Sequence, residues 1–243
     1  MARRLAPRVR IDDLGRVQLQ IGGRAVDGGS MRRKVLALLC FLVTRSGQSA
    51  TREEVLEALW PDLTPSTALN SLNQTVYFLR RVFEPAFSED ITAGYVGQDG
   101  ETVWLDRELI TTRSQACRDM IRKMPSVPSP DEVVLLAREY SGRFALDFMY
   151  EDWASAYRDS LHAAYLRVVE AALRLDTDTG HYARGIEIAE LATDVEPDSE
   201  DLQVALLRLY RLAGSHAAAA EQYGHYSQTL RELGVEPQPF GAL

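Results

Sequence analysis

The sequence lacks the features of a membrane-spanning or secreted protein. No apolar run in its 243 residues approaches the roughly 18 residues that a transmembrane helix needs. The basic start, MARRLAPRVR, leads into alternating strand-like residues and not into the apolar core of a signal peptide. We therefore expect a cytoplasmic protein without a membrane partner.

Signals for catalysis and for metal binding are also scarce. Cys40 and Cys117 lie far apart in helical patterns, which favours buried free thiols in a reducing compartment. No Gly-rich phosphate loop, HExxH, CxxC or nucleophile-elbow motif occurs. Ligand-like spacing is missing from the histidines, for which we expect surface or structural roles: His162, His181, His216 and His225. The sequence predicts a protein that is no enzyme, with no catalytic residues, no metal and no cofactor.

The net charge of −8 hides an asymmetry along the chain. Residues 1–124 hold 18 Lys and Arg against 15 Asp and Glu, a balance of +3. Residues 125–243 hold 9 against 20, a balance of −11, which suggests two domains with different partners. The segment Pro125–Pro130 is too rich in proline to continue a helix, and it flows into a capping box at Ser129 and Glu132. We predict domains at 1–124 and 125–243.

The N-terminal half begins with patterns typical of short strands and then of a helix. Apolar residues alternate with polar ones over 9–11 and 17–21, and Gly22-Gly23 offers a turn before a third run at 24–26. A helix is expected over 31–43, with one buried face made of Leu36, Leu39, Cys40 and Val43.

Two more helices and a hairpin follow. A capping box at Thr51 and Glu54 opens a short helix that stops at Trp60-Pro61, and Thr64 with Pro65 opens the next. Asp99-Gly100 between two β-rich runs is a signal for a two-residue hairpin turn. This order is that of a winged helix, whose third helix enters the major groove of DNA.

The third of these helices has two contrasting faces. An apolar stripe recurs at helical spacing, through Leu69, Leu72, Val76, Leu79 and Phe83. The opposite side holds amides, a tyrosine and arginines, although an ordinary solvated face would more often hold Glu and Lys. Asn and Gln can pair with adenine, and Arg can pair with guanine or phosphate oxygens. We predict DNA contacts from this face and from the start of the first helix, by Asn70, Asn73, Gln74, Tyr77, Arg80, Arg81, Arg32 and Arg33.

Some of these positions keep alternative interpretations. A solvated helix start explains Arg32 and Arg33 equally well. Phe78 lies off the apolar stripe, and three interpretations stay open for it. Its ring could contact a thymine methyl group, contact protein, or pack against the wing. Trp60 and Trp153 are interpreted as core anchors.

The C-terminal half predicts helices throughout. One long apolar stripe is expected at Trp153, Tyr157, Leu161, Ala164, Val168, Ala172 and Leu175. Gly180 and Gly214 are 34 residues apart, the period of tetratricopeptide helix pairs, although Gly185 stands where that pattern expects alanine. A second unit runs past its expected proline to 233–237, as an irregular terminal repeat. The fold class is mainly α with small β: a winged helix-turn-helix followed by an all-α, tetratricopeptide-like domain.

Several segments in this order give the chain a resemblance to a known family. They are LEALWPD (Leu56–Asp62), NSLNQTVYFLRRVF (Asn70–Phe83), VWLD (Val103–Asp106), YSGRFALDF (Tyr140–Phe148), GHYARGIEIAELATDVEP (Gly180–Pro197) and LGVEP. Over about residues 9–240 the chain resembles the Streptomyces antibiotic regulatory protein family. That family joins a response-regulator-type winged helix to a bacterial transcriptional activator domain.

The resemblance implies a transcription activator that binds direct repeats in double-stranded promoter DNA. It also implies side-by-side pairing, as a homodimer at least on DNA, and contact with RNA polymerase holoenzyme. The chain departs from the family pattern at Phe78, where a basic residue is usual, and at Thr75, where histidine is common. The wing, 91–105, holds Asp99 and Glu101 but no Lys or Arg. Two alternatives stay open: a protein-interaction scaffold with a degenerate winged helix, and the DNA-binding fragment of a larger ATPase-containing regulator.

Overall fold

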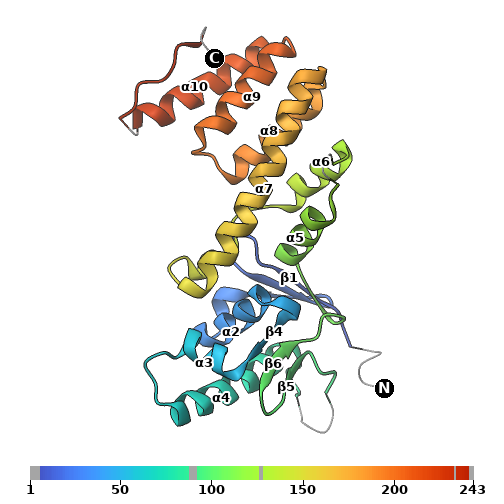
Figure 1. The fold of residues 1–243 in the computed structure, drawn as a ribbon, viewed down its shortest axis with the longest axis vertical. Coiled ribbons are helices and arrows are strands. Elements are labelled where there is room, and N and C mark those ends of the chain that lie inside the picture. The colour runs from blue at the N-terminus through green and yellow to red at the C-terminus, as the bar shows by residue number, and fades with distance from the viewer. Residues whose placement is uncertain (1–5, 88–91, 126–127, 233, 241–243) are drawn as a thin grey trace. The chain divides into compact units, whose positions relative to one another are not determined.

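The computed structural model describes residues 6–87, 92–125, 128–232 and 234–240 (Figure 1). Ser126 and Val127 of the predicted linker, Ile91 of the predicted wing and Leu233 of the LGVEP segment lie outside this range. Among the helices of the described part, none is both long and apolar enough to span a bilayer.

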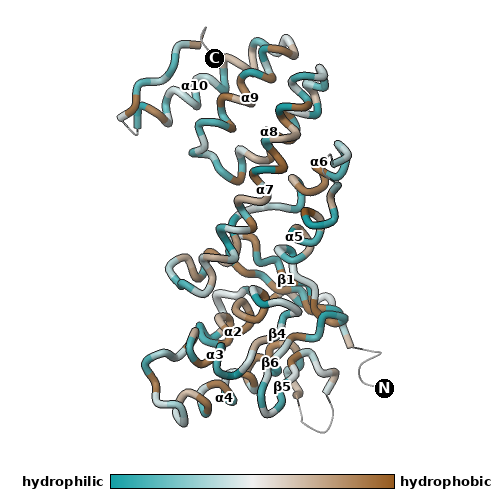
Figure 2. Tube along the Cα trace, viewed as in Figure 1, coloured by the Kyte–Doolittle hydropathy of each residue, from teal (hydrophilic) through white to brown (hydrophobic). Residues whose placement is uncertain are grey.

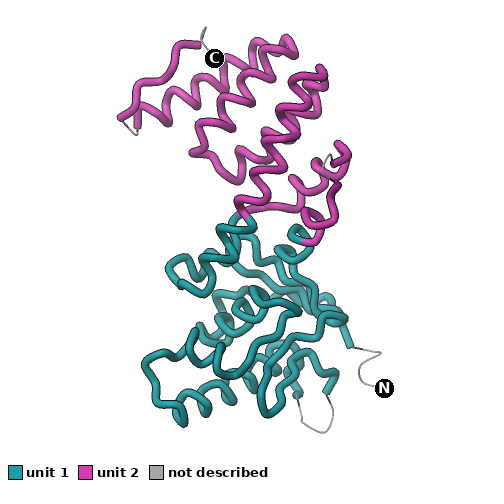
Figure 3. The backbone as a smooth tube through the Cα atoms, viewed as in Figure 1, with its two compact units in different colours: residues 1–118, 143–161 teal, residues 119–142, 162–243 magenta. Residues whose placement is uncertain are grey.

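The chain divides into two compact units, and the first is not continuous in sequence (Figure 3). Unit 1 comprises residues 1–118 and 143–161, and unit 2 comprises residues 119–142 and 162–243. The division into domains at residue 124 stays a prediction. The contacts themselves place residues 143–161 with the N-terminal elements.

Unit 1 contains a sheet made of the three predicted N-terminal strands and a fourth strand from later in the sequence. The strands are β1 (Val9–Asp12), β2 (Gln18–Ile21), β3 (Arg24–Asp27) and β7 (Ile110–Thr112). Their order is β3-β2-β1-β7, and β1 runs antiparallel to β2 but parallel to β7. Gly22 makes the β2–β3 turn at a φ of +59°, a conformation that glycine adopts without steric cost. One face of this sheet is buried by alternating residues, as predicted.

A second, smaller sheet and the predicted helices complete the winged helix. The helices are α2 (Arg33–Thr44), α3 (Arg52–Leu59) and α4 (Pro65–Phe83). The strands β4 (Ser49–Thr51), β5 (Val96–Gln98) and β6 (Thr102–Leu105) pair in the order β4-β6-β5. Short 3-10 helices lie at Gly28–Ser30 and Ser46–Gln48. The capping box of Thr51 and Glu54 is present, and Trp60 ends α3 as predicted.

Helix α2 is buried well beyond the predicted face of Leu36, Leu39, Cys40 and Val43, all four of which are buried. Every residue from Val35 to Val43 is buried. The additional cover comes from distant sequence: the ring of Trp153 packs edge-on against Phe41, with 5.9 Å between centroids. Trp153 is therefore a packing residue, in agreement with its interpretation as a core anchor.

Residues 143–148 run beside the end of β1. Gly15 donates its N–H to the Arg143 carbonyl at 2.8 Å, and Ala145 donates to the Asp13 carbonyl at 2.8 Å. The carboxylate of Asp147, in the 3-10 helix Leu146–Phe148, accepts a 2.8 Å bond from Val17 N–H. These bonds tie two segments more than 120 residues apart in sequence.

A buried arginine fixes the shape of the same loop. Arg158 is 6% exposed and donates to the carbonyls of Phe144 (2.8 Å), Phe148 (2.7 Å) and Met149 (2.8 Å). Burial lowers the pKa of its guanidinium. The loop needs this support because Ala145 has a φ of +46°, in the left-handed region that side chains disfavour.

Unit 2 is helical in its described residues. Its helices are α6 (Pro130–Glu139), the later turns of α7 (Asp152–Thr179), α8 (Tyr182–Val195), α9 (Glu200–Leu212) and α10 (His216–Glu232); α5 (Arg113–Lys123) begins in unit 1. The capping box of Ser129 and Glu132 opens α6 as predicted. In Figure 2, hydrophobic and hydrophilic segments alternate along α8 and α9, as expected for helices buried on one side.

The first predicted 34-residue unit is the helix pair α8–α9. Gly185 lies where these helices touch: a Cβ there would come within 3.0 Å of Leu209 Cδ2. Close packing thus accounts for glycine in place of the expected alanine. The second unit is irregular, as predicted for a terminal repeat: residues 216–232 form α10, and residues 234–240 add no second helix of that kind.

The predicted stripe of α7 is one residue out of phase beyond Leu161. The buried residues there are His162, Tyr165, Val169, Leu173 and Asp176, whereas Leu175 is 42% exposed. A partner just after α6 favours the observed phase, since the ring of Tyr165 stacks on that of Tyr140, the C-cap residue of α6, with 4.0 Å between centroids.

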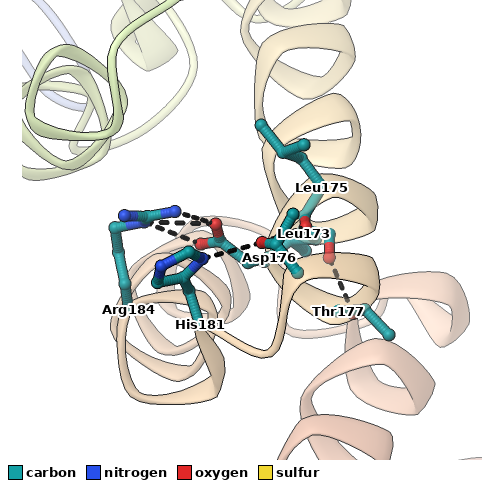
Figure 4. A network of polar contacts seen from close by, with 7 residues as sticks. Leu173, Leu175, Asp176, Thr177, His181 and Arg184 are labelled. Atoms are coloured by element: carbon teal, nitrogen blue, oxygen red, sulfur yellow. Dashed lines mark hydrogen bonds and ion pairs between the residues drawn. The ribbon is translucent and has the colours of Figure 1, made fainter.

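Buried polar groups join the helices of unit 2. His162 Nδ1 lies 3.1 Å from Tyr140 Oη, and its Nε2 lies 3.1 Å from Glu196 Oε1, which gives this histidine the structural role expected for it. At the end of α7 the Asp176 carboxylate pairs with Arg184 of α8, and the Asp176 carbonyl accepts the His181 N–H at 2.9 Å (Figure 4).

Candidate nucleic-acid interface

Helix α4 is held by a buried stripe close to the predicted one. The buried positions are Ala68, Leu72, Thr75, Val76, Leu79 and Phe83. Leu69 is only partly buried, and Thr75 is buried with its hydroxyl donating to the Ser71 carbonyl at 2.7 Å. The residue that replaces the family's histidine therefore belongs to the packed side of the helix. Thr64 is the N-cap as predicted, but its hydroxyl pairs with Thr67 Oγ1 at 2.9 Å and makes no capping bond to the backbone.

The opposite side of α4 is an exposed polar and aromatic surface. Asn70, Gln74 and Arg81 are exposed, and Tyr77 is 43% exposed. Asn70 and Gln74 make no side-chain hydrogen bond with any residue that the structure describes. Their amides are thus available to an external partner with donor and acceptor groups.

Two of the predicted contact residues bind the wing, the hairpin β5–β6, and their contact with DNA stays a prediction. Asn73 Oδ1 accepts a 2.9 Å bond from Gln98 Nε2. Arg80 is partly buried, and its Nε donates to the Val96 carbonyl at 3.0 Å. These side chains fix the wing to α4. Gln98 and Val96 carried no sequence signal for this role, because the bonds depend on how the hairpin folds back on the helix.

The turn of the wing is centred on Gly100-Glu101, one residue later than predicted. Asp99 and Thr102 close it, with a 3.0 Å bond from Asp99 N–H to the Thr102 carbonyl. The Asp99 carboxylate accepts from the N–H groups of Glu101 (2.8 Å) and Thr102 (2.7 Å). These bonds lower the pKa of Asp99. One of the two acids in the wing is therefore a turn-stabilising group.

The two arginines at the start of α2 have different surroundings. Arg33 Nη2 lies 3.1 Å from Glu151 Oε1, and its guanidinium lies 5.1 Å from the ring centroid of Phe148. Arg32 is the N-cap residue, and its guanidinium carbon lies 3.8 Å from the ring centroid of Phe78 on α4. Phe78 thus contacts an arginine of the same chain, a partner that the sequence did not identify.

Aromatic side chains continue this cluster along α4. Tyr77 packs edge-on against Phe78 (5.6 Å between centroids) and against Phe87 (6.1 Å). The Arg81 guanidinium lies 5.9 Å from the Tyr77 ring, and that of Arg80 lies 5.4 Å from the Phe87 ring. The exposed side of α4 therefore combines amides, cations and rings, a combination suited to base edges and phosphates.

The two cysteines are buried side chains of unit 1. Cys40 and Cys117 are both buried, as predicted, and neither forms a disulfide bond. The described residues contain no group of three or more His, Cys, Asp and Glu side chains placed to hold a metal ion.

Two protein-family models match the chain on either side of residue 124. Residues 28–95 match "Transcriptional regulatory protein, C terminal", and residues 136–240 match "Bacterial transcriptional activator domain". The first match includes α2, α3 and α4, and the second includes α7 to α10. The chain thus has the domain composition of a transcription regulator.

Two curated proteins are similar to almost the whole chain. "Regulatory protein AfsR" of Streptomyces coelicolor is 28% identical over 233 residues, which are 95% of this chain and 23% of that protein. The protein of the same name from Streptomyces griseus is 26% identical over 239 residues, 96% of this chain and 24% of that protein. The chain therefore spans about a quarter of the length of the curated relatives it matches.

A solved structure has the same fold. It is that of Mycobacterium tuberculosis EmbR in complex with a low-affinity phosphopeptide, with a TM-score of 0.59 and 20% sequence identity. The match covers 96% of this chain and 63% of that one. It confirms the predicted architecture of a winged helix followed by a helical domain.

Proposed function

We propose that the chain is a member of the Streptomyces antibiotic regulatory protein family and a sequence-specific transcription activator that reads promoter DNA with α4. The observation that supports this most directly is the exposed surface opposite the buried stripe of α4. Asn70 and Gln74 offer free amides there, and Arg81 adds a cation. An amide can pair with adenine N6 and N7, and a guanidinium can pair with guanine or phosphate oxygens.

The charge balance of residues 1–124 supports binding in pairs. Residues 1–124 hold only three more cations than acids, and Arg33 is paired with Glu151. One copy should therefore neutralise few phosphates and bind weakly. Two copies on adjacent half-sites raise each other's effective concentration. We propose that the chain occupies direct repeats cooperatively, as a homodimer at least on DNA.

The second half of the chain supports the activating role. Its balance of −11 is unsuited to the DNA backbone and suited to a basic protein surface. We propose RNA polymerase holoenzyme as the partner of this half. The protein itself needs no catalytic residue or cofactor for this work.

The test is a selection of genomic fragments by the purified full chain, followed by sequencing. We expect enrichment of fragments that contain a direct repeat, with tighter binding to the repeat than to either half-site alone. Run-off transcription from an enriched fragment should rise when the chain is added. Recovery of fragments without a shared sequence, or equal affinity for one and two half-sites, would count against the proposal.

A groove in unit 2 favours a second candidate, the protein-interaction scaffold. It has a volume of about 570 Å³, between α7 and α9, and its lining includes Leu166, Leu173, Leu202 and Arg208. Helical repeats of this kind bind partners on such surfaces. The double substitution N70A/Q74A separates the candidates. It should abolish fragment enrichment by an activator, whereas a scaffold should show no enrichment even as the wild type.

A further inference from the structure

The contact between Phe78 and Arg32 is the shortest cation–ring contact among the described residues. The Arg32 guanidinium carbon lies 3.8 Å from the Phe78 centroid, and the corresponding distances elsewhere run from 4.3 to 5.9 Å. At 3.8 Å the guanidinium is in van der Waals contact with the ring. A cation over an aromatic face is attracted by the ring quadrupole. The two side chains therefore form a defined pair.

The Arg32 cation has no competing partner in the described part of the chain. No hydrogen bond or ion pair joins it to a residue there, and the first turn of α2 contains no acid. Its neighbour Arg33, in contrast, lies 3.1 Å from a Glu151 carboxylate oxygen. Arg32 is also exposed, so its charge faces solvent.

The guanidinium carbon of Arg32 lies over the Phe78 ring, and no hydrogen bond to a described residue occupies the N–H donors of this guanidinium. The five N–H donors lie in the guanidinium plane and point outward from its carbon, so they can bind another group while the carbon stays over the ring. The free edge can bind a phosphate through two parallel bonds. Because Phe78 belongs to α4, it holds this edge next to the helix that carries Asn70, Gln74 and Arg81.

We propose that Phe78 is a positioning residue for DNA binding, whose ring holds Arg32 ready to bind a backbone phosphate beside the groove. The inference rests on the proposed function, since it assumes that α4 enters the groove. It also accounts for the absence of a basic residue at position 78. The cation comes from the start of α2, and α4 supplies the ring that orients it.

The test compares substitutions in the full chain by DNA affinity at several salt concentrations. The probes are a duplex recovered by the genomic selection and an unrelated duplex of equal length. R32A should reduce the slope of log affinity against log salt by about 0.9 on both duplexes, because one phosphate contact is lost. F78L should weaken binding about two- to fivefold on both duplexes.

Coupling between the two residues distinguishes positioning from independent contacts. The double variant F78L/R32A should bind no more weakly than R32A alone, and F78Y, which keeps the ring, should bind like the wild type. R16A is the control, because Arg16 is an exposed arginine of unit 1 outside α4, the wing and the start of α2. It should leave the slope unchanged. Thermal unfolding of each variant confirms that the fold is intact.

Two results would overturn the inference while the proposed function survives. One is wild-type affinity of F78L, or additive losses in F78L/R32A. The other is a loss in F78L confined to the selected duplex at one base pair, which would make Phe78 a base contact. A wild-type chain that binds neither duplex would reject the proposed function itself.

Discussion

Asp13 and Ser114 are joined by two hydrogen bonds in the interior of unit 1, although 101 residues separate them in sequence. Asp13 Oδ1 accepts from Ser114 N–H at 2.8 Å, and Oδ2 accepts from the Ser114 hydroxyl at 2.6 Å. Tyr157 donates to the same hydroxyl at 3.1 Å. A carboxyl group at the end of β1 thus links the start of α5 with α7. Burial raises its pKa from 3.8 to about 6, against the lowering effect of these bonds.

This raised pKa predicts a specific pH dependence of stability. A folded-state pKa above the unfolded value means that the stabilising contribution of Asp13 is complete below about pH 4 and is lost as pH rises through about 6. In D13N the group cannot ionise. The free energy of unfolding of D13N, relative to the wild type, should therefore increase by up to about 3 kcal/mol between pH 4 and pH 7.

Urea unfolding at a series of pH values measures this difference. D62N is the control, since Asp62 is exposed and its substitution should change the free energy of unfolding only slightly. A difference between D13N and wild type that stays constant from pH 4 to 7 would contradict the prediction.

The two sides of α4 predict two separable effects. L72A removes a fully buried side chain and should cost about 2–5 kcal/mol of stability. R81A changes an exposed side chain whose one hydrogen-bond acceptor among the described residues, the Pro85 carbonyl, is 3.5 Å away, so stability should change by less than about 0.5 kcal/mol. DNA affinity should nevertheless fall in R81A. Chemical unfolding and fluorescence anisotropy on a selected duplex measure the two effects, and wild-type DNA affinity of R81A would be the opposing result.

Position 97 in the wing should not tolerate a side chain larger than that of glycine. A Cβ on Gly97 would lie 2.0 Å from Trp104 Cε2, its cross-strand partner, so the indole ring would have to move. G97A should destabilise the chain by about 1–3 kcal/mol. G100A is the matched control, because a Cβ on Gly100 meets no atom within 4 Å. Equal melting temperatures for the two variants would show that the ring moves aside without cost.

Because unit 1 includes residues 143–161, we predict that residues 1–124 fold poorly alone. Removing residues 143–161 takes away Trp153 from Phe41 and the bonds that Gly15 and Asp13 make with the loop. Residues 1–161 retain all of these contacts. We expect a cooperative thermal transition, followed by circular dichroism, for 1–161 and a broad or much lower transition for 1–124. Identical transitions would show that the later segment adds nothing to this unit.

Local signals in the sequence predicted the elements of the fold well. The capping boxes at Thr51 and Ser129 each satisfy the first N–H groups of a helix within four residues of sequence, so spacing alone reveals them. The hairpin followed from a turn signal between β-rich runs, although its centre moved by one residue. The stripe of α4 followed from helical periodicity.

Contacts between distant segments account for what the sequence did not reveal. The phase of α7 depends on Tyr140 stacking on Tyr165, and periodicity could not choose between adjacent stripes of apolar residues. Arg80 was expected on the DNA surface, but its reach to Val96 depends on the path of the wing. Phe78 and Arg32 lie 46 positions apart, and no pattern along the chain marks them as partners.

The discontinuity of unit 1 also affects how the chain folds while it is synthesised. A ribosome adds roughly 5–20 residues per second, so an interval on the order of seconds separates the appearance of residue 118 from that of residue 161. During that interval Phe41 lacks the indole that covers it in the finished unit. The nascent chain therefore presents apolar surface until α7 begins to emerge, and a chaperone that binds such surface has its best opportunity then.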